Sequence, residues 1–297
     1  MPLYQRILVI KLGAFGDVVL CFGVMQALRA HYPNAHITLL TIPLFEDMMR
    51  QSGYVDDVWL IRRWPWWQPR NWLNFAKALR AGNYDCVYDL QRNDRTTMLR
   101  RLAPASLRRA WFGGKGGSGA PYAEGALVAD IKSLAVPALE WLDVDISKFS
   151  IPSPFVLLVP GSAPQHPLKR WPAASYAAVA QTLAFAGYTP VIIGTAAEAD
   201  IIASIKQQVP AAVDLGGKTT LADVGALARK AAGAVGNDTG PMHLIAAAGC
   251  PSLSLFSGIT SPAQSAPKGA VVKTMQGAPI ETLAAEDVAA GLLSILR

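Results

Sequence analysis

The chain has 297 residues, of which 52% are hydrophobic and 16% are charged, so long disordered stretches are excluded and two domains of ordinary size are allowed. Lys and Arg outnumber Asp and Glu by 18 to 13 in residues 1–150 and by 9 to 8 in residues 151–297. This basic surplus in the first half suits an anionic partner, such as a phosphorylated glycolipid, an anionic membrane surface or a nucleic acid. A basic face that is merely solvated is the alternative interpretation.

Strands and helices alternate through the first half of the chain. Buried strands are expected at 6–12, 36–41, 57–61, 86–90 and 109–112, and helices at 17–31, 43–51, 72–80 and 92–102. This alternation predicts a parallel sheet that is covered by helices on both faces.

Glycine and proline mark the middle of the chain. Residues 113–119 (GGKGGSG) predict a flexible loop, and residues 137–154, with three prolines, predict an interdomain linker. We therefore assign 1–150 to an N-terminal domain that includes the linker, and 151–297 to a C-terminal domain.

The second half repeats the alternating scheme. Strands are expected at 155–159, 190–193, 213–215, 233–236 and 252–256, and helices at 172–186, 196–208, 220–232, 241–248 and 285–296. Two doubly wound halves predict a cleft between them, and ligands bind such sheets beyond the carboxyl ends of the strands. The loops expected at those ends are 13–17, 160–170, 194–198 and 237–240.

A strand, a polar turn and a helix follow one another in residues 235–248. Asp238, Thr239 and Gly240 form the turn, and Pro241 is suited to the first turn of a helix. The unpaired N–H groups of a helix start attract phosphate, Gly240 lets a ligand approach, and His243 lies one turn further on. In the alternative interpretation Asp238 only caps the helix.

The loop after the first strand contains Gly13, Gly16 and Asp17. It does not match the dinucleotide fingerprint, and its two glycines bend the chain. The carboxylate of Asp17 can remove a proton from an attacking hydroxyl group, or it can serve only as a helix N-cap.

An aromatic run, WPWWQP at 64–69, lies beside Arg62, Arg63 and Arg70. Indoles next to cations suit a membrane interface or a sugar-stacking acceptor site. A loop folded over the core of the first domain is the alternative. The expected acceptor-side residues are Gly13, Gly16, Arg62, Arg63 and Trp66.

Three motifs carry a family resemblance, in the order in which the family has them. They are residues 7–19 (ILVIKLGAFGDVV), Pro160-Gly161-Ser162 with Lys169-Arg170-Trp171-Pro172, and residues 238–243 (DTGPMH) with Gly249-Cys250-Pro251. The chain resembles glycosyltransferase family 9, the ADP-heptose:lipopolysaccharide heptosyltransferases. The resemblance implies the α/β GT-B architecture, with two Rossmann-like, doubly wound parallel-sheet domains.

The resemblance also implies a function. The expected enzyme is an inverting, metal-independent glycosyltransferase that moves heptose or a related sugar from an ADP-sugar to a lipopolysaccharide-core-like acceptor. The catalytic residues would be Asp17, as the base, and Lys169, which aligns with the phosphate-binding lysine of the family. The expected residues that bind the ADP-sugar are Ser162, Lys169, Arg170, Glu198 (at the ribose), Thr219, Asp238, Thr239, Gly240 and His243.

Several of these residues also have a purely structural interpretation. Lys169 and Arg170 could be surface charges beside Trp171, and Glu198 a first-turn helix acid. Of Thr219 and Thr220, we expect one to flank the adenine and the other to cap a helix.

No resident cofactor and no metal ion are expected, because the three cysteines and four histidines lack the spacing of metal ligands. The expected partners are an ADP-sugar and an anionic glycolipid, without nucleic acid, in the cytoplasm and in peripheral contact with the inner membrane. The first apolar run is only strand-length, so no signal peptide is expected.

Two other functions remain open from the sequence. One is a catalytically silent nucleotide-sugar binding protein, and the other is a non-hydrolysing nucleotide-sugar epimerase. Residues 113–136 are shorter and richer in small residues than the corresponding region of the family, which puts the acceptor site in question.

Overall fold

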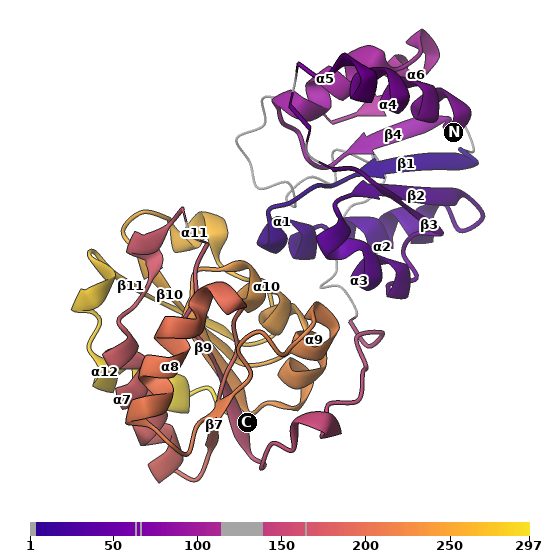
Figure 1. The fold of residues 1–297 in the computed structure, drawn as a ribbon. Coiled ribbons are helices and arrows are strands. Elements are labelled where there is room, and N and C mark those ends of the chain that lie inside the picture. Colours follow the sequence, from indigo (N-terminus) through magenta and orange to yellow (C-terminus); the bar gives the residue numbers. More distant parts are fainter. Residues whose placement is uncertain (1–3, 63, 66, 114–138, 164) are drawn as a thin grey trace. The chain divides into compact units, whose positions relative to one another are not determined.

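The computed structural model describes residues 4–62, 64–65, 67–113, 139–163 and 165–297. The chain divides into two compact units, Met1–Pro137 and Ala138–Arg297 (Figure 1). Each unit is a parallel sheet with helices on both faces, which is the predicted fold class. None of the helices in the described ranges combines the length and the apolar character that a membrane span requires.

The sheet of the first unit has the strand order β3-β2-β1-β4-β5, and all neighbouring strands are parallel. The strands are β1 (Arg6–Ile10), β2 (His36–Thr41), β3 (Asp57–Leu60), β4 (Cys86–Asp89) and β5 (Trp111–Phe112). The central strand β1 reads Ile-Leu-Val-Ile after Arg6 and is buried on both faces. The direction of winding reverses between β1 and β4, and ligands bind doubly wound sheets at this position.

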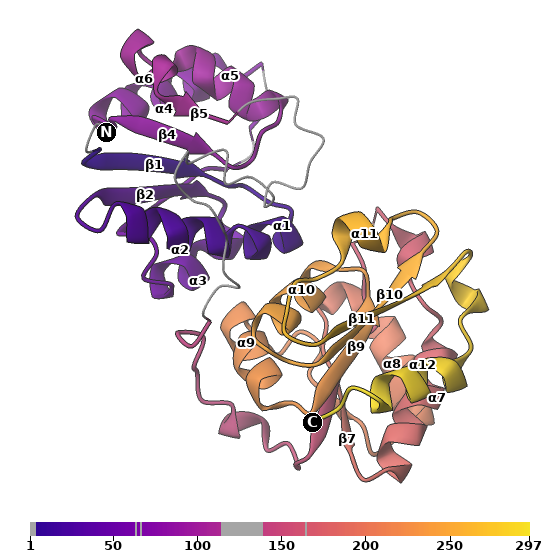
Figure 2. The same ribbon diagram turned by 180° about the vertical axis from the view of Figure 1, so that it is seen from behind.

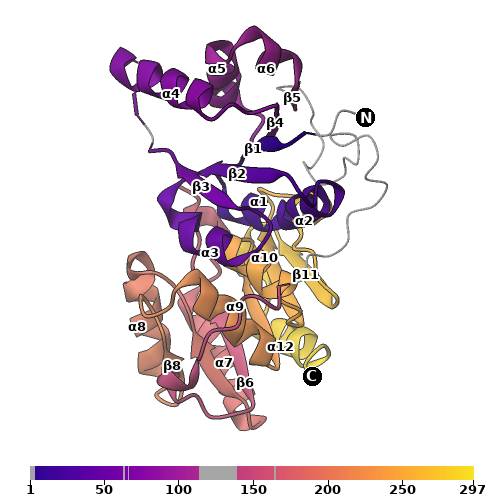
Figure 3. The ribbon, with the colours of Figure 1, turned by 90° about the vertical axis from the view of Figure 1, so that its right-hand side faces the viewer.

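Helices cover the two faces of this sheet in chain order (Figure 3). The first face carries α1 (Phe15–Leu20), α2 (Phe22–His31), the 3₁₀ turn η1 (Pro43–Phe45) and α3 (Glu46–Gln51), and the second face carries α4 (Pro69–Ala81), α5 (Asp94–Leu102) and α6 (Ala105–Arg109). The single helix that the sequence predicts at 17–31 is divided at Cys21. The short helix α6 was not predicted, because five residues after a proline give no measurable period.

The second unit has six parallel strands in the order β11-β10-β9-β6-β7-β8. They are β6 (Phe155–Val159), β7 (Thr189–Ile192), β8 (Val213–Asp214), β9 (Gly233–Asn237), β10 (Ser252–Ser257) and β11 (Val272–Gly277). The winding reverses between β6 and β9. The edge strand β11 was missed, because its sequence VKTMQG keeps polar side chains on the exposed positions and resembles a loop.

The helices of the second unit form two groups (Figure 2). They are α7 (Ala173–Phe185), α8 (Ala199–Gln208), α9 (Leu221–Lys230), α10 (Gly240–Ala247), α11 (Pro262–Ser265) and α12 (Ala285–Leu293), with 3₁₀ turns η2 (Ser147–Phe149), η3 (Pro167–Lys169), η4 (Ala196–Glu198) and η5 (Ile280–Thr282). Helix α7 packs against α8 and α12 over the main core, and α9 packs against α10.

The segment that the sequence assigns to the first domain as a linker is held by the second unit. Leu142 is fully buried, and it lies against Gly225 of α9 so closely that a side chain at 225 would collide with it. Arg229 of α9 donates a hydrogen bond to the carbonyl oxygen of Glu140 at 2.8 Å. Residues 139–150 therefore belong to the second unit by their contacts, and the predicted loop 113–119 lies, after Gly113, outside the described residues.

Candidate active site

The loops after β6 and β9 meet at the reversal point of the second sheet. The Nζ atom of Lys169, at the end of η3, lies 2.7 Å from Oδ2 of Asp238, which follows β9. The hydroxyl group of Thr260, after β10, donates to the same carboxylate oxygen at 2.6 Å. The side chains of Lys169 and Asp238 are only 12% and 6% exposed, so the pair is shielded from solvent and strongly oriented.

Asn237 fixes the position of this ion pair. Its Oδ1 accepts hydrogen bonds from the backbone N–H of Trp171 (3.1 Å) and the Tyr176 hydroxyl group (3.0 Å). Its Nδ2 donates to the carbonyl oxygens of Pro160 (2.7 Å) and Gly161 (3.2 Å). The fully buried amide therefore ties the loop that carries Lys169 to strand β9. The sequence analysis missed Asn237, and the signal was a polar residue directly before the Asp238 turn.

Ser162 and Arg170 hold the same loop together. The hydroxyl group of Ser162 donates to the carbonyl oxygen of His166 at 2.9 Å and accepts from Nε of Arg170 at 3.1 Å. Arg170 also donates through Nη2 to the Ser162 carbonyl oxygen at 3.1 Å. These bonds give both residues a structural role, and the binding of a ligand by either one stays a prediction.

The turn after β9 is built differently from the capping interpretation. Thr239 is the N-cap residue of α10, without a side-chain capping bond, and the helix begins at Gly240. Asp238 is committed to Lys169 and Thr260, so its side chain orients the turn rather than capping the helix. Helix α10 therefore has eight residues with Gly240 as the first, and His243 within it is buried.

Glu198 lies across the ends of β6 and β7. Its Oε2 accepts from the N–H and the hydroxyl group of Thr195, which places it in a capping box. A Cβ atom at Gly161 would lie 2.7 Å from Cγ of Glu198, so a larger residue at 161 would displace this carboxyl side chain from its position. The structural interpretation of Glu198 is thus satisfied, and its contact with a ribose stays a prediction.

The expected division between Thr219 and Thr220 agrees with the helix start. Thr220 is the N-cap of α9, and its hydroxyl oxygen accepts from the N–H of Asp223 at 3.1 Å. Thr219 is half-buried beside it, and its contact with an adenine stays a prediction.

The corresponding edge of the first unit contains Asp17. Its Oδ2 accepts from the Ala14 N–H at 3.2 Å and lies 3.8 Å from Nζ of Lys11. Lys11 is 2% exposed and also donates to the carbonyl oxygen of Leu90, whereas the Asp17 side chain is 47% exposed. A buried ammonium group therefore stands behind a carboxylate that faces solvent. Lys11 was missed as a site residue, although a lysine that ends an aliphatic strand is an informative signal.

Gly13 and Gly16 differ in what they do. Gly13 has φ +133, a conformation that favours glycine, and it turns the chain after β1. Gly16 lies inside α1 and is buried.

The thiol of Cys21, which follows α1, is also buried. Burial raises the pKa of this thiol to about 12, with the positive charge of Lys11 opposing this rise. The thiol therefore stays protonated and does not act as a nucleophile beside Asp17.

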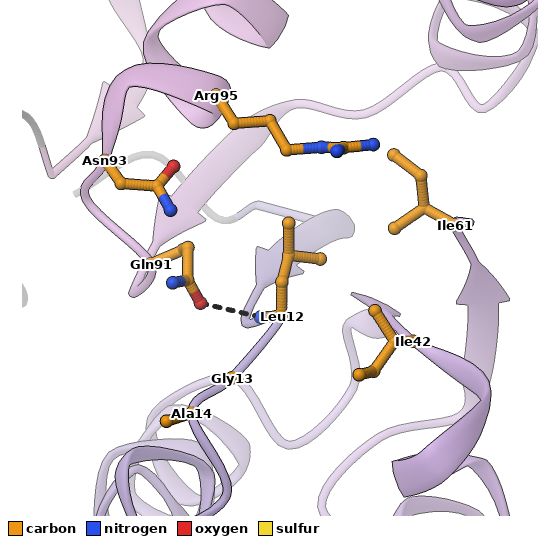
Figure 4. A pocket seen from close by; sticks show the side chains of 8 residues that line it. All are labelled: Leu12, Gly13, Ala14, Ile42, Ile61, Gln91, Asn93 and Arg95. Atoms are coloured by element: carbon orange, nitrogen blue, oxygen red, sulfur yellow. Dashed lines mark hydrogen bonds between the residues drawn. The ribbon is translucent and has the colours of Figure 1, made fainter. Parts of the chain in front are cut away.

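A cavity of about 330 Å³ opens at the carboxyl edge of this sheet (Figure 4). It is lined by Leu12, Gly13, Ala14, Ile42, Ile61, Gln91, Asn93 and Arg95. Gln91 accepts from the Leu12 N–H at 2.8 Å and so joins the ends of β1 and β4. The cavity combines an apolar wall with amide groups and one guanidinium group, which is suitable for a polar ligand that has an apolar face.

The aromatic segment is divided between core and surface. Trp64 packs at right angles to Trp72, 5.6 Å between ring centres, and the guanidinium group of Arg95 lies 4.9 Å from the ring centre of Trp64. Arg95 also donates to the carbonyl oxygen of Arg62, whereas Trp67 is 64% exposed. Arg63 and Trp66 lie outside the described residues, so their acceptor-side role stays a prediction.

Comparison with known proteins identifies the family. The family model for glycosyltransferase family 9 (heptosyltransferase) matches residues 133–279, which include every residue of the second-unit site. The chain belongs to glycosyltransferase family 9. It is therefore a member of a family of glycosyltransferases, and the ion pair of Lys169 and Asp238 lies within the matched residues.

Two curated relatives are heptosyltransferases. The chain is 33% identical to lipooligosaccharide heptosyltransferase 2 of Haemophilus influenzae over 132 residues, which is 42% of this chain but only 38% of that protein. It is 24% identical to lipopolysaccharide heptosyltransferase 3 of Escherichia coli over 278 residues, 81% of this chain and 80% of that protein.

Solved structures of this family have the same fold. A glycosyltransferase of family 9 from Veillonella parvula superposes with a TM-score of 0.82 at 19% identity, covering 98% of this chain and 97% of that one. The E. coli heptosyltransferase WaaC with ADP superposes with a TM-score of 0.75 at 20% identity, covering 97% and 98%. The two doubly wound units of this family 9 chain thus have the GT-B architecture that the sequence predicts.

Proposed function

We propose that this family 9 chain transfers heptose or a related sugar from an ADP-sugar to a lipopolysaccharide-core-like acceptor. The observation that carries the proposal is the buried Lys169–Asp238 pair beside the start of α10, at the reversal point of a doubly wound sheet. The names of its relatives support heptose as the sugar, and a structure of similar fold was solved with ADP.

The diphosphate of the ADP-sugar would bind between Lys169 and the N–H groups at the start of α10. Negative charge grows on this diphosphate as the sugar bond breaks. A cation and a helix start that are already in place stabilise that charge without reorganisation. Lys169 has three N–H donors, so it can bind phosphate oxygens while Asp238 continues to orient it. Glu198 would accept hydrogen bonds from the ribose hydroxyl groups, and Thr219 would flank the adenine.

Asp17 would act as the general base. Its carboxylate is accessible, and the ammonium group of Lys11 lies 3.8 Å from it on the buried side. It would remove the proton from the acceptor hydroxyl group while the oxygen attacks the anomeric carbon on the side opposite the leaving ADP. One displacement of this kind inverts the configuration of the sugar.

The cavity of the first unit would receive the acceptor sugar. Sugars present apolar C–H faces and hydroxyl edges, which suit Leu12 and Ile61 on one side and Gln91 and Asn93 on the other. Arg95 and the basic surplus of residues 1–150 suit an anionic glycolipid. We propose that the reaction takes place in the cytoplasm, where the three free, buried cysteines would stay reduced.

The test uses the purified chain with ADP-heptose and a deacylated lipopolysaccharide-core acceptor, and it measures the release of ADP. Asp17→Asn should bind ADP like the unchanged protein and lower kcat by roughly 10²–10⁴, the usual contribution of a general base. Asp47→Asn is the matched control, since Asp47 is an exposed acid in the first turn of α3.

Two outcomes would contradict the proposal. Binding of ADP-heptose without release of ADP would indicate a silent binding protein. Full activity of Asp17→Asn would remove Asp17 from the mechanism.

We also propose that no metal ion takes part, because Lys169 and the start of α10 can balance the diphosphate charge. Transfer should persist in EDTA. Loss of activity in EDTA and its recovery with Mg²⁺ or Mn²⁺ would overturn this part, and NMR of the product's anomeric centre tests inversion.

A further inference from the structure

The helices of the first unit distribute charge unequally between the two faces of its sheet. Helices α4, α5 and α6 contain eight Lys or Arg residues and one acidic residue, Asp94. Helices α1, α2 and α3 contain two Arg and three acidic residues. Because α4–α6 lie together on one face of the sheet (Figure 3), that face is strongly positive.

The charge is most regular on α4. Arg70, Leu73, Lys77 and Arg80 are all exposed, and their spacing of three, four and three residues places them on one side of the helix. The opposite side, with Phe75 and Leu79, is buried in the core. This outward stripe contains no carboxylate, because α4 has no acidic residue.

Large apolar side chains are exposed on α4, just before it and on the neighbouring helix α5. Leu73 is 69% exposed in the middle of the stripe, Trp67 is 64% exposed just before α4, and Met98 of α5 is 41% exposed. A single exposed leucine is ordinary in a soluble protein. Apolar side chains that stand among cations are typical of helices that lie in the interface of an anionic bilayer. Nucleic-acid phosphates would use the cations but would give the leucine no contact.

We propose that this basic face, the outer side of α4 with Trp67 and Met98, binds the surface of an anionic bilayer. The inference rests on the proposed function, because only a lipid-borne acceptor gives such a surface a role. Helix α5 connects the two sites, since its Arg95 lines the cavity while its Met98 lies on the basic face. Docking would therefore bring the head of a membrane-bound glycolipid to the acceptor cavity.

The test is sedimentation of the full chain with phosphatidylcholine vesicles that either contain or lack phosphatidylglycerol. Binding should require phosphatidylglycerol and should weaken as salt is raised, because salt screens exposed charges. Lys77→Gln/Arg80→Gln should lower the partition coefficient about thirty-fold, roughly fivefold for each cation. Leu73→Gln should lower it about five- to tenfold through lost apolar burial.

Matched controls come from the second unit. Lys218→Gln/Lys268→Gln changes the net charge equally, and Phe185→Gln removes a side chain that is 96% exposed on α7. Both should bind vesicles like the unchanged protein. Equal binding to both kinds of vesicle, or equal weakening by controls and test variants, would overturn the proposal. If duplex DNA released the protein from the vesicles and Leu73→Gln had no effect on vesicle binding, the basic face would be a general polyanion-binding surface instead.

A second readout separates this proposal from the proposed function. Transfer to the deacylated, water-soluble acceptor is measured without vesicles, and the α4 variants should retain its full rate. Failure of the unchanged protein in that assay would contradict the function, whereas only the vesicle results test the basic face.

Discussion

At the scale of single residues, the candidate site depends on side chains that fix other side chains. The sequence motif predicts Lys169 and Asp238, but it gives no sign that they pair with each other. Asn237 uses four hydrogen bonds to hold the loop that carries Lys169 to strand β9, and no local pattern predicts partners that are 61 to 77 positions away in the chain. Such long-range bonds arise from the sheet order, so they become visible only in the fold.

Lys169→Ala should weaken ADP binding about ten-fold and lower kcat by a further 10²–10³, because the cation matters most when the diphosphate leaves. Calorimetry with ADP and single-turnover transfer measure the two effects. Lys218→Ala removes a mostly exposed lysine of the same unit and should change neither.

The single variant also leaves the carboxylate of Asp238 buried without its cation, which costs roughly 3–5 kcal/mol of stability. Lys169→Ala/Asp238→Asn removes both charges and should recover part of that stability but not the binding of ADP. Recovery of ADP binding in the double variant would show that the unpaired carboxylate, and not the missing cation, causes the loss.

The three cysteines should not react in the native protein. Burial raises the pKa of the Cys21, Cys86 and Cys250 thiols to about 12. At pH 8 the reactive thiolate is therefore scarce and covered. A disulfide reagent should label no thiol in native buffer and three in denaturant, and rapid labelling of one native cysteine would contradict this expectation.

At the scale of elements, the alternating pattern predicts most strands and helices and fails for the short helix α6 and the edge strand β11. Strand β6 is entirely apolar and was predicted with its observed ends, because a strand buried on both faces has one pattern only. Strand β11, VKTMQG, lies at the sheet edge without a regular alternation of polar and apolar residues, and it was missed. The sequence analysis predicts that Thr219 or Thr220 caps a helix, but it does not predict the capping box with Asp223 or the contact of Asp223 with Lys148.

Asp223→Ala should destabilise the second unit by about 1–2 kcal/mol at pH 7, because it removes the capping box and the 2.6 Å contact with Lys148. Burial raises the pKa of Asp223, but the hydrogen bonds from Lys148 and Thr220 outweigh burial and lower it. A lowered folded pKa contributes stability above the unfolded value of about 3.9, and this contribution is lost as pH falls through the folded pKa.

The difference in unfolding free energy between the unchanged protein and Asp223→Ala should therefore be smaller at pH 3 than at pH 7. Urea unfolding at both pH values measures it, with Asp200→Ala, an exposed first-turn acid of α8, as the control. A difference that does not depend on pH would show that the ionised form contributes nothing.

At the scale of the whole molecule, the sequence predicts two doubly wound sheets but places their boundary by composition alone. Three prolines in 137–154 are typical of a linker, and proline content carries no information about which surface a segment contacts. Leu142 packs on α9, 83 residues later in the chain, at a position that only glycine can occupy. The family resemblance supplied the site residues, while the cleft between the two sheets stays a prediction.

The contacts of residues 139–150 predict where the second unit can be separated. The fragment 139–297 should fold alone and bind ADP within about ten-fold of the full chain, because every expected ADP contact lies in it. It should show no transfer, because it lacks Asp17.

The fragment 151–297 lacks Leu142 and Lys148, so it loses a fully buried leucine and the partner of Asp223. Its unfolding free energy should be lower by at least about 3 kcal/mol, and Leu142→Ala in the full chain should reproduce roughly 2–5 kcal/mol of destabilisation. Urea unfolding and calorimetry with ADP compare the two fragments, and Leu73→Ala, which truncates an exposed leucine, is the control for the point variant. Equal stability of the two fragments would mean that residues 139–150 are only a linker, because a segment that completes the core of the second unit cannot be removed without cost.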